Sequence, residues 1–243
     1  MLSQNTVIYI WYYGKIIMNK HKWGVSLNRD FFQQDAINLA KDILGKYLIR
    51  EYDGIQIVSK IVETEAYMGV NDKAAHVYGD KKTDRTMPLY LDGGHIYVYL
   101  IYGMYYCLNI SANKENIPEC VLIRAIEPVK GIEEICENRY KKNYSNLSTY
   151  QKKNISNGPG KLCMALNIDK SLNSKSILDN ELYISDFYYE EGKKVFAYDK
   201  FEIEIGKRIN IDYAEEAKDY LWRFYIKDNK YVSVINKNKT VNK

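Results

Sequence analysis

The sequence contains few of the residues that build metal centres or disulfide frameworks. Its 243 residues include four cysteines and three histidines, with no C-x-x-C spacing and no histidine near a cysteine. We therefore expect no zinc or other metal site, and reduced, mostly buried thiols. The chain also lacks a G-x-G-x-x-G loop and a βαβ rhythm, which argues against a nucleotide-binding Rossmann unit, so no cofactor is expected.

Long apolar runs are absent as well. The apolar stretch 7–18 is too short to cross a bilayer, no basic region precedes it and no small-residue cleavage site follows it. We expect no membrane contact and no signal peptide, hence a cytoplasmic protein, associated with the nucleoid if the cell is bacterial. Met18 is a candidate alternative start. The expected divisions are an N-terminal extension over 1–27, one domain over 28–236 and a polar tail over 237–243.

The net charge of +4 permits a polyanionic partner without requiring one, but the charge is unevenly distributed. Residues 141–175 contain seven lysines and one acid, whereas acids outnumber bases two to one over 177–220. This separation favours one surface for phosphate and another for water. A solvated lysine-rich loop explains the same pattern, and the sequence leaves both interpretations open.

Short apolar runs separated by turn residues predict an α+β domain. Strands joined by short turns imply a mostly antiparallel sheet with helices packed outside it. Asp53-Gly54 is a hairpin signal between two strands. The expected helices are 33–44, 131–139 and 159–166, and the expected strands are 47–50, 55–67, 95–100, 104–111, 121–126, 183–185, 202–205, 208–211, 223–226 and 232–235.

The segment 61–67 (IVETEAY) holds the clearest chemical signal. Side chains alternate along a strand, so Val62 and every second residue after it face one way, and Glu63, Glu65 and Tyr67 face the other. Two carboxylates about 7 Å apart beside an aromatic ring are a poor fit to a core. An exposed edge strand, where acids are common, is the alternative.

Tyrosine is the compositional excess, with 24 residues against six phenylalanines and three tryptophans. Five of them lie within 95–109, where Tyr97 and Tyr99 share a strand face and Tyr102 precedes Gly103 at a predicted hairpin tip. An aromatic ring at such a tip can wedge between bases. A tyrosine-rich hairpin packed on a core is the alternative, and for Tyr97 sheet packing is the favoured role.

Glycines also mark the start of the last predicted helix, in the segment 157–162 (NGPGKL). Gly158 and Gly160 would expose backbone N–H groups at the positive end of the helix dipole, and Lys161 adds a cation. The pattern favours phosphate contacts by these three residues. A simple Gly-Pro-Gly turn explains the segment equally well.

Taken together, these segments resemble the alkyladenine (3-methyladenine) DNA glycosylase family, over roughly residues 28–236. The resemblance implies a single α+β domain with a curved, mostly antiparallel, open-barrel-like sheet flanked by helices. It rests on ordered motifs: Glu63-Thr-Glu65-Ala-Tyr67, Ala74-Ala-His76, Tyr97-Val-Tyr-Leu-Ile-Tyr-Gly-Met104, Asn109-Ile, Leu122-Ile-Arg124-Ala, Glu127-Pro128 and Gly158-Pro-Gly-Lys-Leu-Cys163.

The resemblance also assigns roles to residues. Glu65 matches the family's general base, and Arg124 matches the arginine that helps to hold the attacking water. Glu63 is expected to be structural. The flipped base would be enclosed by Tyr67, His76 and Tyr99, with Asn109 as a steric gate against the amine of normal guanine and Tyr102 as the intercalating wedge.

The expected function is therefore a monofunctional DNA-3-methyladenine glycosylase of base excision repair. It would act as a monomer on duplex DNA containing alkylated purines, of the 3-methyladenine and 7-methylguanine type, and would hydrolyse the N-glycosidic bond without a metal or cofactor. A bifunctional glycosylase/AP lyase and a non-catalytic nucleic-acid-binding module are the alternatives. The sequence does not decide whether hypoxanthine or ethenoadenine is also accepted.

Overall fold

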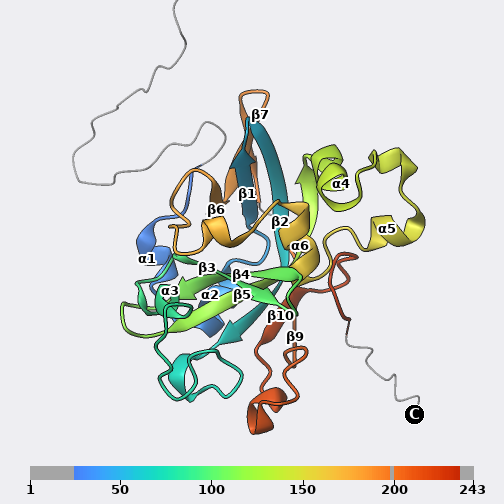
Figure 1. Cartoon of the computed structure of the whole chain (residues 1–243). Helices are drawn as coiled ribbons and strands as arrows, with labels where there is room; N and C mark the ends of the chain where they lie inside the picture. Colours follow the sequence, from blue (N-terminus) through green and yellow to red (C-terminus); the bar gives the residue numbers. More distant parts are fainter. Residues whose placement is uncertain (1–24, 198–199, 236–243) are drawn as a thin grey trace, which may run out of the picture.

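A curled antiparallel sheet forms the centre of the computed structural model, which describes residues 25–197 and 200–235 (Figure 1). Most of the expected N-terminal extension and all of the polar tail lie outside the described residues. The chain forms one α+β domain, as the sequence predicts. The strands are β1 (Tyr47–Tyr52), β2 (Ile55–Tyr67), β3 (Ile96–Ile101), β4 (Tyr105–Ala112), β5 (Glu119–Lys130), β6 (Leu182–Ser185), β7 (Phe187–Glu190), β8 (Lys193–Phe196), β9 (Ile203–Gly206) and β10 (Arg223–Ile226).

Strand β2 is the longest strand and organises the sheet. The main path runs in the order β3-β4-β5-β2-β1-β6. The first half of β2 pairs with β1 and its second half pairs with β10, which in turn pairs with β9. Asp53 and Gly54, at φ 48° and 77°, form the predicted turn between β1 and β2. Glu63 and Glu65 thus lie in the half of β2 that β5 and β10 enclose.

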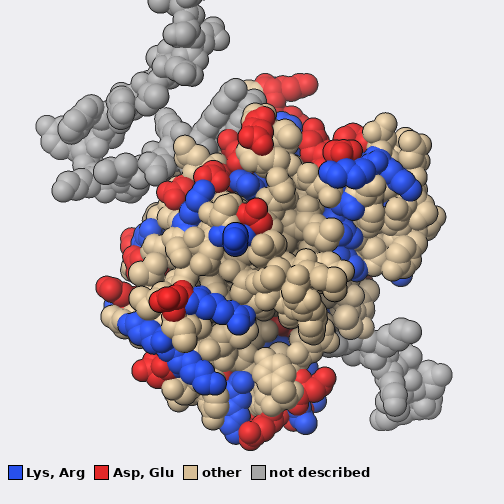
Figure 2. Space-filling view, viewed as in Figure 1, with Lys and Arg blue, Asp and Glu red and all other residues tan. Residues whose placement is uncertain are grey.

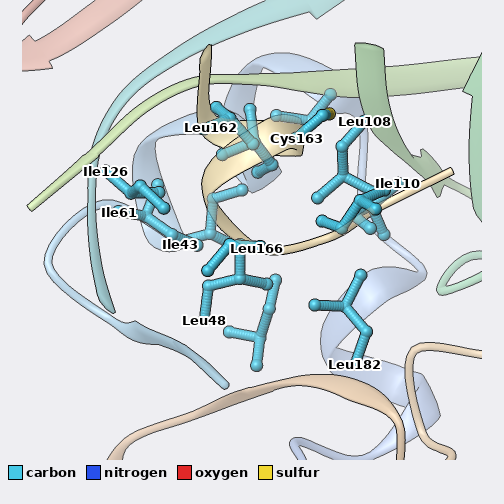
Figure 3. Packing of buried hydrophobic residues seen from close by; sticks show 14 of the residues in the cluster. Ile43, Leu48, Ile61, Leu108, Ile110, Ile126, Leu162, Cys163, Leu166 and Leu182 are labelled. Carbon is cyan, nitrogen blue, oxygen red and sulfur yellow. The ribbon is translucent and has the colours of Figure 1, made fainter. Parts of the chain in front are cut away.

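Helices cover one face of this sheet and supply the main core. Asp35 caps α2 by accepting hydrogen bonds from the backbone N–H groups of Ile37 and Asn38. Leucine and isoleucine side chains from α2, α6 and the sheet interdigitate there (Figure 3). The helices are α1 (Arg29–Phe32), α2 (Ala36–Asp42), α3 (Met87–Tyr90), α4 (Ile132–Tyr140), α5 (Thr149–Lys153) and α6 (Pro159–Ala165). We call the opposite side of the sheet, turned away from α2, the outer face.

A bulge in the β2–β5 ladder changes which side chains reach the outer face. The register shifts on both sides of Glu63. As a result Val62 packs with Ala125 on the outer face, whereas Thr64 donates from its hydroxyl to the carbonyl of Ala40 in α2, at 2.8 Å. The expectation that Val62 and Thr64 share a face is therefore wrong, because the extra residue of a bulge reverses the alternation.

Two expected strands are absent from the described residues, and a common reason accounts for both. Segments 208–211 and 232–235 are irregular. In each segment one backbone N–H bonds to a buried carboxylate instead of a neighbouring strand: Ile209 N–H donates to Glu65 at 2.8 Å and Ser233 N–H donates to Glu63 at 2.7 Å. Conversely, the β7–β8 hairpin and α5 were not expected.

The four cysteines, Cys107, Cys120, Cys136 and Cys163, are buried free thiols, as predicted. Burial raises the pKa of the Cys120 thiol above its ordinary value, and the same holds for Cys163. The neutral thiol is therefore the form present at neutral pH. Within the described ranges, no helix combines the length and hydropathy needed to cross a bilayer.

Candidate active site

Five neighbouring strands place one residue each in a row across the outer face of the sheet. Tyr97 of β3 is opposite Asn109 of β4, and Asn109 is opposite Leu122 of β5. Leu122 is opposite Glu65 of β2, which is opposite Arg223 of β10. Directly opposed residues have Cβ atoms only about 4.5–5.5 Å apart. The strand register therefore brings together residues that are widely separated in the sequence.

Glu65 is fully buried, and both oxygens of its carboxylate are held by donors. Oε1 accepts a hydrogen bond from the backbone N–H of Ile209 at 2.8 Å and lies 3.2 Å from Nη1 of Arg124. Oε2 accepts from the hydroxyl of Tyr67 at 2.9 Å. A buried carboxylate with these partners is held in one orientation, as a general base requires.

Arg124 lies between the two glutamates of β2. Its Nη1 reaches Glu65 as described, and its Nε lies 3.4 Å from Oε1 of Glu63. Burial opposes the charge of Arg124, but Glu65 and Glu63 outweigh that effect and keep its pKa above the ordinary value. The structure thus brings together Glu65 and Arg124, the two residues expected to act on the water.

Glu63 is equally buried but is enclosed by the C-terminal part of the chain. Its Oε1 accepts from Nη1 of Arg223 at 2.9 Å and from the hydroxyl of Ser233 at 2.9 Å, while its Oε2 accepts the Ser233 N–H. These contacts fix the segment after β10 onto the sheet. They agree with the structural role expected for Glu63.

A pocket opens beside Glu65, and Tyr67 connects the two by lining the pocket while donating to the carboxylate. The hollow is partly open to solvent and is lined by aromatic rings together with small and aliphatic side chains. All four residues expected to enclose the base contribute to its wall. The lining residues are Tyr67, Ala74, Ala75, His76, Val77, Leu89, Tyr97, Tyr99, Asn109, Pro118, Cys120 and Tyr213.

Three aromatic rings of this wall form one cluster. The His76 ring meets the Tyr99 ring edge-on, with centroids 4.5 Å apart, and the rings of Tyr97 and Tyr99 are 5.4 Å apart. Nδ1 of His76 is hydrogen-bonded to the hydroxyl of Tyr97 at 2.9 Å. Tyr97 is buried in a cluster on the sheet, as expected, but it also lines the pocket and holds the His76 ring by this hydrogen bond. Asn109 donates from its amide to the carbonyl of Tyr97 at 3.2 Å.

The polar groups of the pocket are neutral at physiological pH. Burial, assisted by the charge of Arg85, lowers the pKa of His76 to about 4. Burial and the neighbouring Glu65 raise the pKa of Tyr67 well above its ordinary value, so its hydroxyl remains a donor. The pKa of Tyr99 is raised too, chiefly by burial. The pocket walls thus offer rings and neutral hydrogen-bonding groups to a bound molecule.

The β3–β4 hairpin projects Tyr102 from its tip. Tyr102 has φ 53° and Gly103 has φ 67°, and Met104 N–H closes the turn on the carbonyl of Ile101 at 3.2 Å. The Tyr102 side chain is 74% exposed, and Met104 beside it is 69% exposed. Large apolar groups are thus held out in solvent by a tight turn, which is the placement that the sequence predicts for Tyr102.

Sequence reasoning missed three contributors to the site. Tyr213 lines the pocket from the loop before β10, and Ile209 of the same loop binds Glu65 through its backbone. The guanidinium of Arg85 lies 5.3 Å from the centroid of the Tyr99 ring. Neither Tyr213 nor Ile209 stands in a recognisable pattern, so only the folded chain reveals them. Arg85 lies in a polar loop without regular structure, where the sequence gives no sign of its contact with Tyr99.

The expected phosphate-binding segment lies at the start of α6. The ammonium of Lys161 donates to Oδ1 of Asn154 at 2.7 Å and to Oδ1 of Asn157 at 2.9 Å. A Cβ atom on Gly160 would lie 2.9 Å from the Cβ of Tyr105, so glycine allows α6 to approach β4 closely. These contacts give Gly160 and Lys161 structural roles. Phosphate binding by Gly158, Gly160 and Lys161 stays a prediction.

Basic side chains gather in two places on the face shown in Figure 2. One band borders the lobe formed by α4 and α5, and another lies where Figure 1 draws the loop before α3. A largely uncharged surface separates them. Residues 81, 82 and 85 of that loop and residues 141 and 142 after α4 are exposed lysines and one arginine. This arrangement offers cations on both sides of a largely uncharged surface.

Comparison with known proteins gives a consistent result. The family model described as "Methylpurine-DNA glycosylase (MPG)" matches residues 30–230. A protein of Clostridioides difficile strain 630 is 72% identical over 201 residues, which cover 82% of this chain and 100% of the relative. Proteins of Clostridium novyi strain NT (54% over 207 residues, 85% and 98%) and Clostridium acetobutylicum (54% over 213 residues, 88% and 100%) are also similar. All three carry the name "Putative 3-methyladenine DNA glycosylase". This chain belongs to the methylpurine-DNA glycosylase family.

Proposed function

We propose that this protein is a monofunctional DNA glycosylase that removes alkylated purines, of the 3-methyladenine and 7-methylguanine type, from duplex DNA. The observation that carries the proposal is the placement of Glu65, a buried carboxylate oriented by Arg124 and Ile209, directly behind a pocket lined by aromatic rings. The names of the relatives point to the same activity.

The chemistry assigned to Glu65 is activation of water. The oxygen of a water molecule attacks C1′ of the sugar as the N-glycosidic bond breaks, and the bonding electron pair leaves with the purine. The Glu65 carboxylate accepts the water proton and stabilises the positive charge that develops on the sugar. Arg124 orients the carboxylate and the water. The products are a free base and an abasic site, and no metal or cofactor takes part.

The pocket favours an alkylated purine for two physical reasons. Such a base carries positive charge and needs no proton in order to leave, which suits a site whose titratable wall groups are neutral. Its charge also strengthens contact with the faces of Tyr67 and Tyr99, by about 0.5–2 kcal/mol per ring. Asn109, in the row beside Tyr97, is placed to act as the gate against normal guanine.

Tyr102 completes the proposal by entering the duplex. Its exposed ring at the tip of a tight turn can fill the gap that the extruded nucleotide leaves. The basic groups on either side of the hairpin region in Figure 2 would contact phosphates. The protein would thereby hold a distorted duplex with the target nucleotide in the pocket.

The bifunctional alternative finds no support in the pocket. A lyase needs an amine that attacks C1′ to form a Schiff base, and the residues that line the pocket in the described part of the chain include no lysine. A purely binding module, in turn, has no use for a buried carboxylate that is oriented by three donors.

The decisive experiment is incubation of the protein with methylated duplex DNA followed by chromatography of the released bases. We expect free 3-methyladenine and 7-methylguanine together with intact abasic strands. Borohydride added to the same reaction should trap no protein–DNA adduct. Absence of free base would overturn the proposal, and a trapped adduct would replace it with the lyase alternative.

A further inference from the structure

Another buried ion pair, between Asp72 and Arg208, has no part in the proposed chemistry. It lies near Glu65, because Arg208 directly precedes Ile209, whose N–H binds that carboxylate. Asp72 follows the end of β2, and Arg208 lies in the loop before β10. The side chains of both are fully buried. Both nitrogens of the guanidinium fork donate to the carboxylate: Nη1 to Oδ2, and Nη2 to Oδ1 at 2.8 Å. This two-point contact defines the relative orientation of two segments that are far apart in the sequence.

Asp72 binds the main chain next to two residues of the pocket wall. Its Oδ2 accepts the backbone N–H of Met68 at 3.1 Å, and its Oδ1 accepts the N–H of Ala74 at 3.0 Å. Met68 directly follows Tyr67, and Ala74 begins the segment that ends in His76. One carboxylate therefore fixes the main chain on both sides of the turn that carries these two pocket residues.

Arg208 connects β2 with the loop before β10. Its Nη1 donates to the carbonyl of Ala66 at 3.0 Å and its Nη2 donates to the carbonyl of Ala217 at 3.2 Å. Its guanidinium also lies 4.7 Å from the centroid of the Tyr67 ring. The next residue, Ile209, gives its N–H to Oε1 of Glu65. The guanidinium thus contacts the two residues that follow Glu65, Ala66 and Tyr67, and it belongs to the residue that precedes Ile209, whose N–H binds the carboxylate.

We propose that Asp72 and Arg208 form a positioning pair for the glycosylase reaction, acting through Ile209 N–H and Tyr67 to hold the Glu65 carboxylate in its reactive orientation. The inference rests on the proposed function. An ordinary buried ion pair would affect only how much protein is folded. A positioning pair also changes how fast the folded, DNA-bound enzyme reacts, because small displacements of a catalytic group are costly in rate.

Single-turnover kinetics separates these two roles. With enzyme in saturating excess over duplex DNA containing one 7-methylguanine, the first-order rate constant reports the reaction of the bound complex and does not depend on what fraction of the excess enzyme is folded. We expect Asp72→Asn to lower the rate constant by about 10–100-fold. Arg208→Lys, which keeps the charge but loses the fork, should give a smaller loss. Affinity for a duplex with an abasic-site analogue should stay within a few-fold of the unsubstituted protein.

Arg50→Lys is the matched control. Arg50 is a buried arginine of β1 that donates to the carbonyls of Glu51 and Glu181 and touches no residue of the site. Its substitution should lower thermal stability while leaving the rate constant unchanged. Unchanged rate constants in both Asp72→Asn and Arg208→Lys would overturn the inference.

The remaining outcomes are also informative. If Asp72→Asn does not fold, Arg208→Lys decides alone: a reduced rate constant at full DNA affinity supports the pair, and an unchanged one refutes it. If the unsubstituted protein releases no base, the proposed function fails before the positioning role is reached. The two failures are therefore distinguishable.

Discussion

Glu63 and Glu65 lie two residues apart on one strand and are both completely buried, yet their surroundings differ in kind. Glu63 is enclosed by Arg223 and Ser233, which belong to β10 and the segment after it. Glu65 is held by Ile209 and by Tyr67, and Tyr67 lines the pocket. Arg124 touches both carboxylates.

The difference shows that burial and charge alone do not distinguish a carboxylate that joins parts of the fold from one that adjoins a pocket. Every donor to Glu63 ties one part of the chain to another, so that carboxylate completes the fold. One donor to Glu65 belongs to a pocket wall, so a molecule in the pocket lies close to that carboxylate. We therefore assign roles to the two carboxylates by asking which of their hydrogen-bond partners line the pocket.

The largest expected effect is on catalysis, from Glu65→Gln. The amide keeps the shape of the side chain but cannot accept the water proton, so the single-turnover rate of base release should fall about 10²–10⁴-fold. Glu63→Gln should reduce the same rate constant much less. Binding to a duplex with an abasic-site analogue should be retained by both variants. Equal rate losses would remove the distinction between the two glutamates.

The second largest expected effect is a loss of stability in Glu63→Gln. Glu63→Gln removes the buried negative charge that faces Arg223 and Arg124, and it weakens the attachment of the segment around Ser233. Breaking a buried pair in this way lowers the free energy of unfolding by about 3–5 kcal/mol. Urea unfolding followed by circular dichroism measures this change. A loss below about 1 kcal/mol, the value typical of an exposed pair, would contradict the structural role.

Much of this contrast could be predicted from the sequence, and the remainder could not, for definite physical reasons. Alternation and turn signals located β2 and the β3–β4 hairpin, because these features are local. The bulge at Glu63 was missed because its cause is the pairing with β5. The strands expected at 208–211 and 232–235 were wrong because the pattern of apolar residues cannot show that a backbone N–H bonds to a distant carboxylate.

Tyr102 extends the comparison to the delivery of substrate. Tyr102→Ala removes the exposed ring of the hairpin tip, so capture of the flipped nucleotide should weaken by about 1–3 kcal/mol. Stability should not change, in contrast to Glu63→Gln. Fluorescence of a 2-aminopurine placed beside the lesion would report flipping. Phe196→Ala, at an exposed aromatic of the β7–β8 hairpin, is the control, and equal losses in both variants would refute the wedge role.

The smallest expected effect is the contribution of His76, a residue of the pocket wall, to the pH dependence of the free energy of unfolding. The pKa of His76 is lowered from 6.5 to about 4 in the folded protein, mainly by burial and then by the charge of Arg85. Between these values the unfolded chain binds more protons than the folded chain, so stability falls as pH is lowered from 6.5 towards 4.

His76→Gln removes this contribution. Between pH 6.5 and 4, the free energy of unfolding of the variant should fall by about 1 kcal/mol less than that of the unsubstituted protein. The difference is small because the His76 ring is only partly buried. Urea unfolding across this range measures the difference, and the offset between the two proteins at pH 7.5 is the internal reference. Parallel stability curves would show that the His76 ring is not desolvated in the folded state. The pocket wall would then be more hydrated than the surroundings of Glu63. The contrast between Glu63 and Glu65 would then depend only on their hydrogen-bond partners.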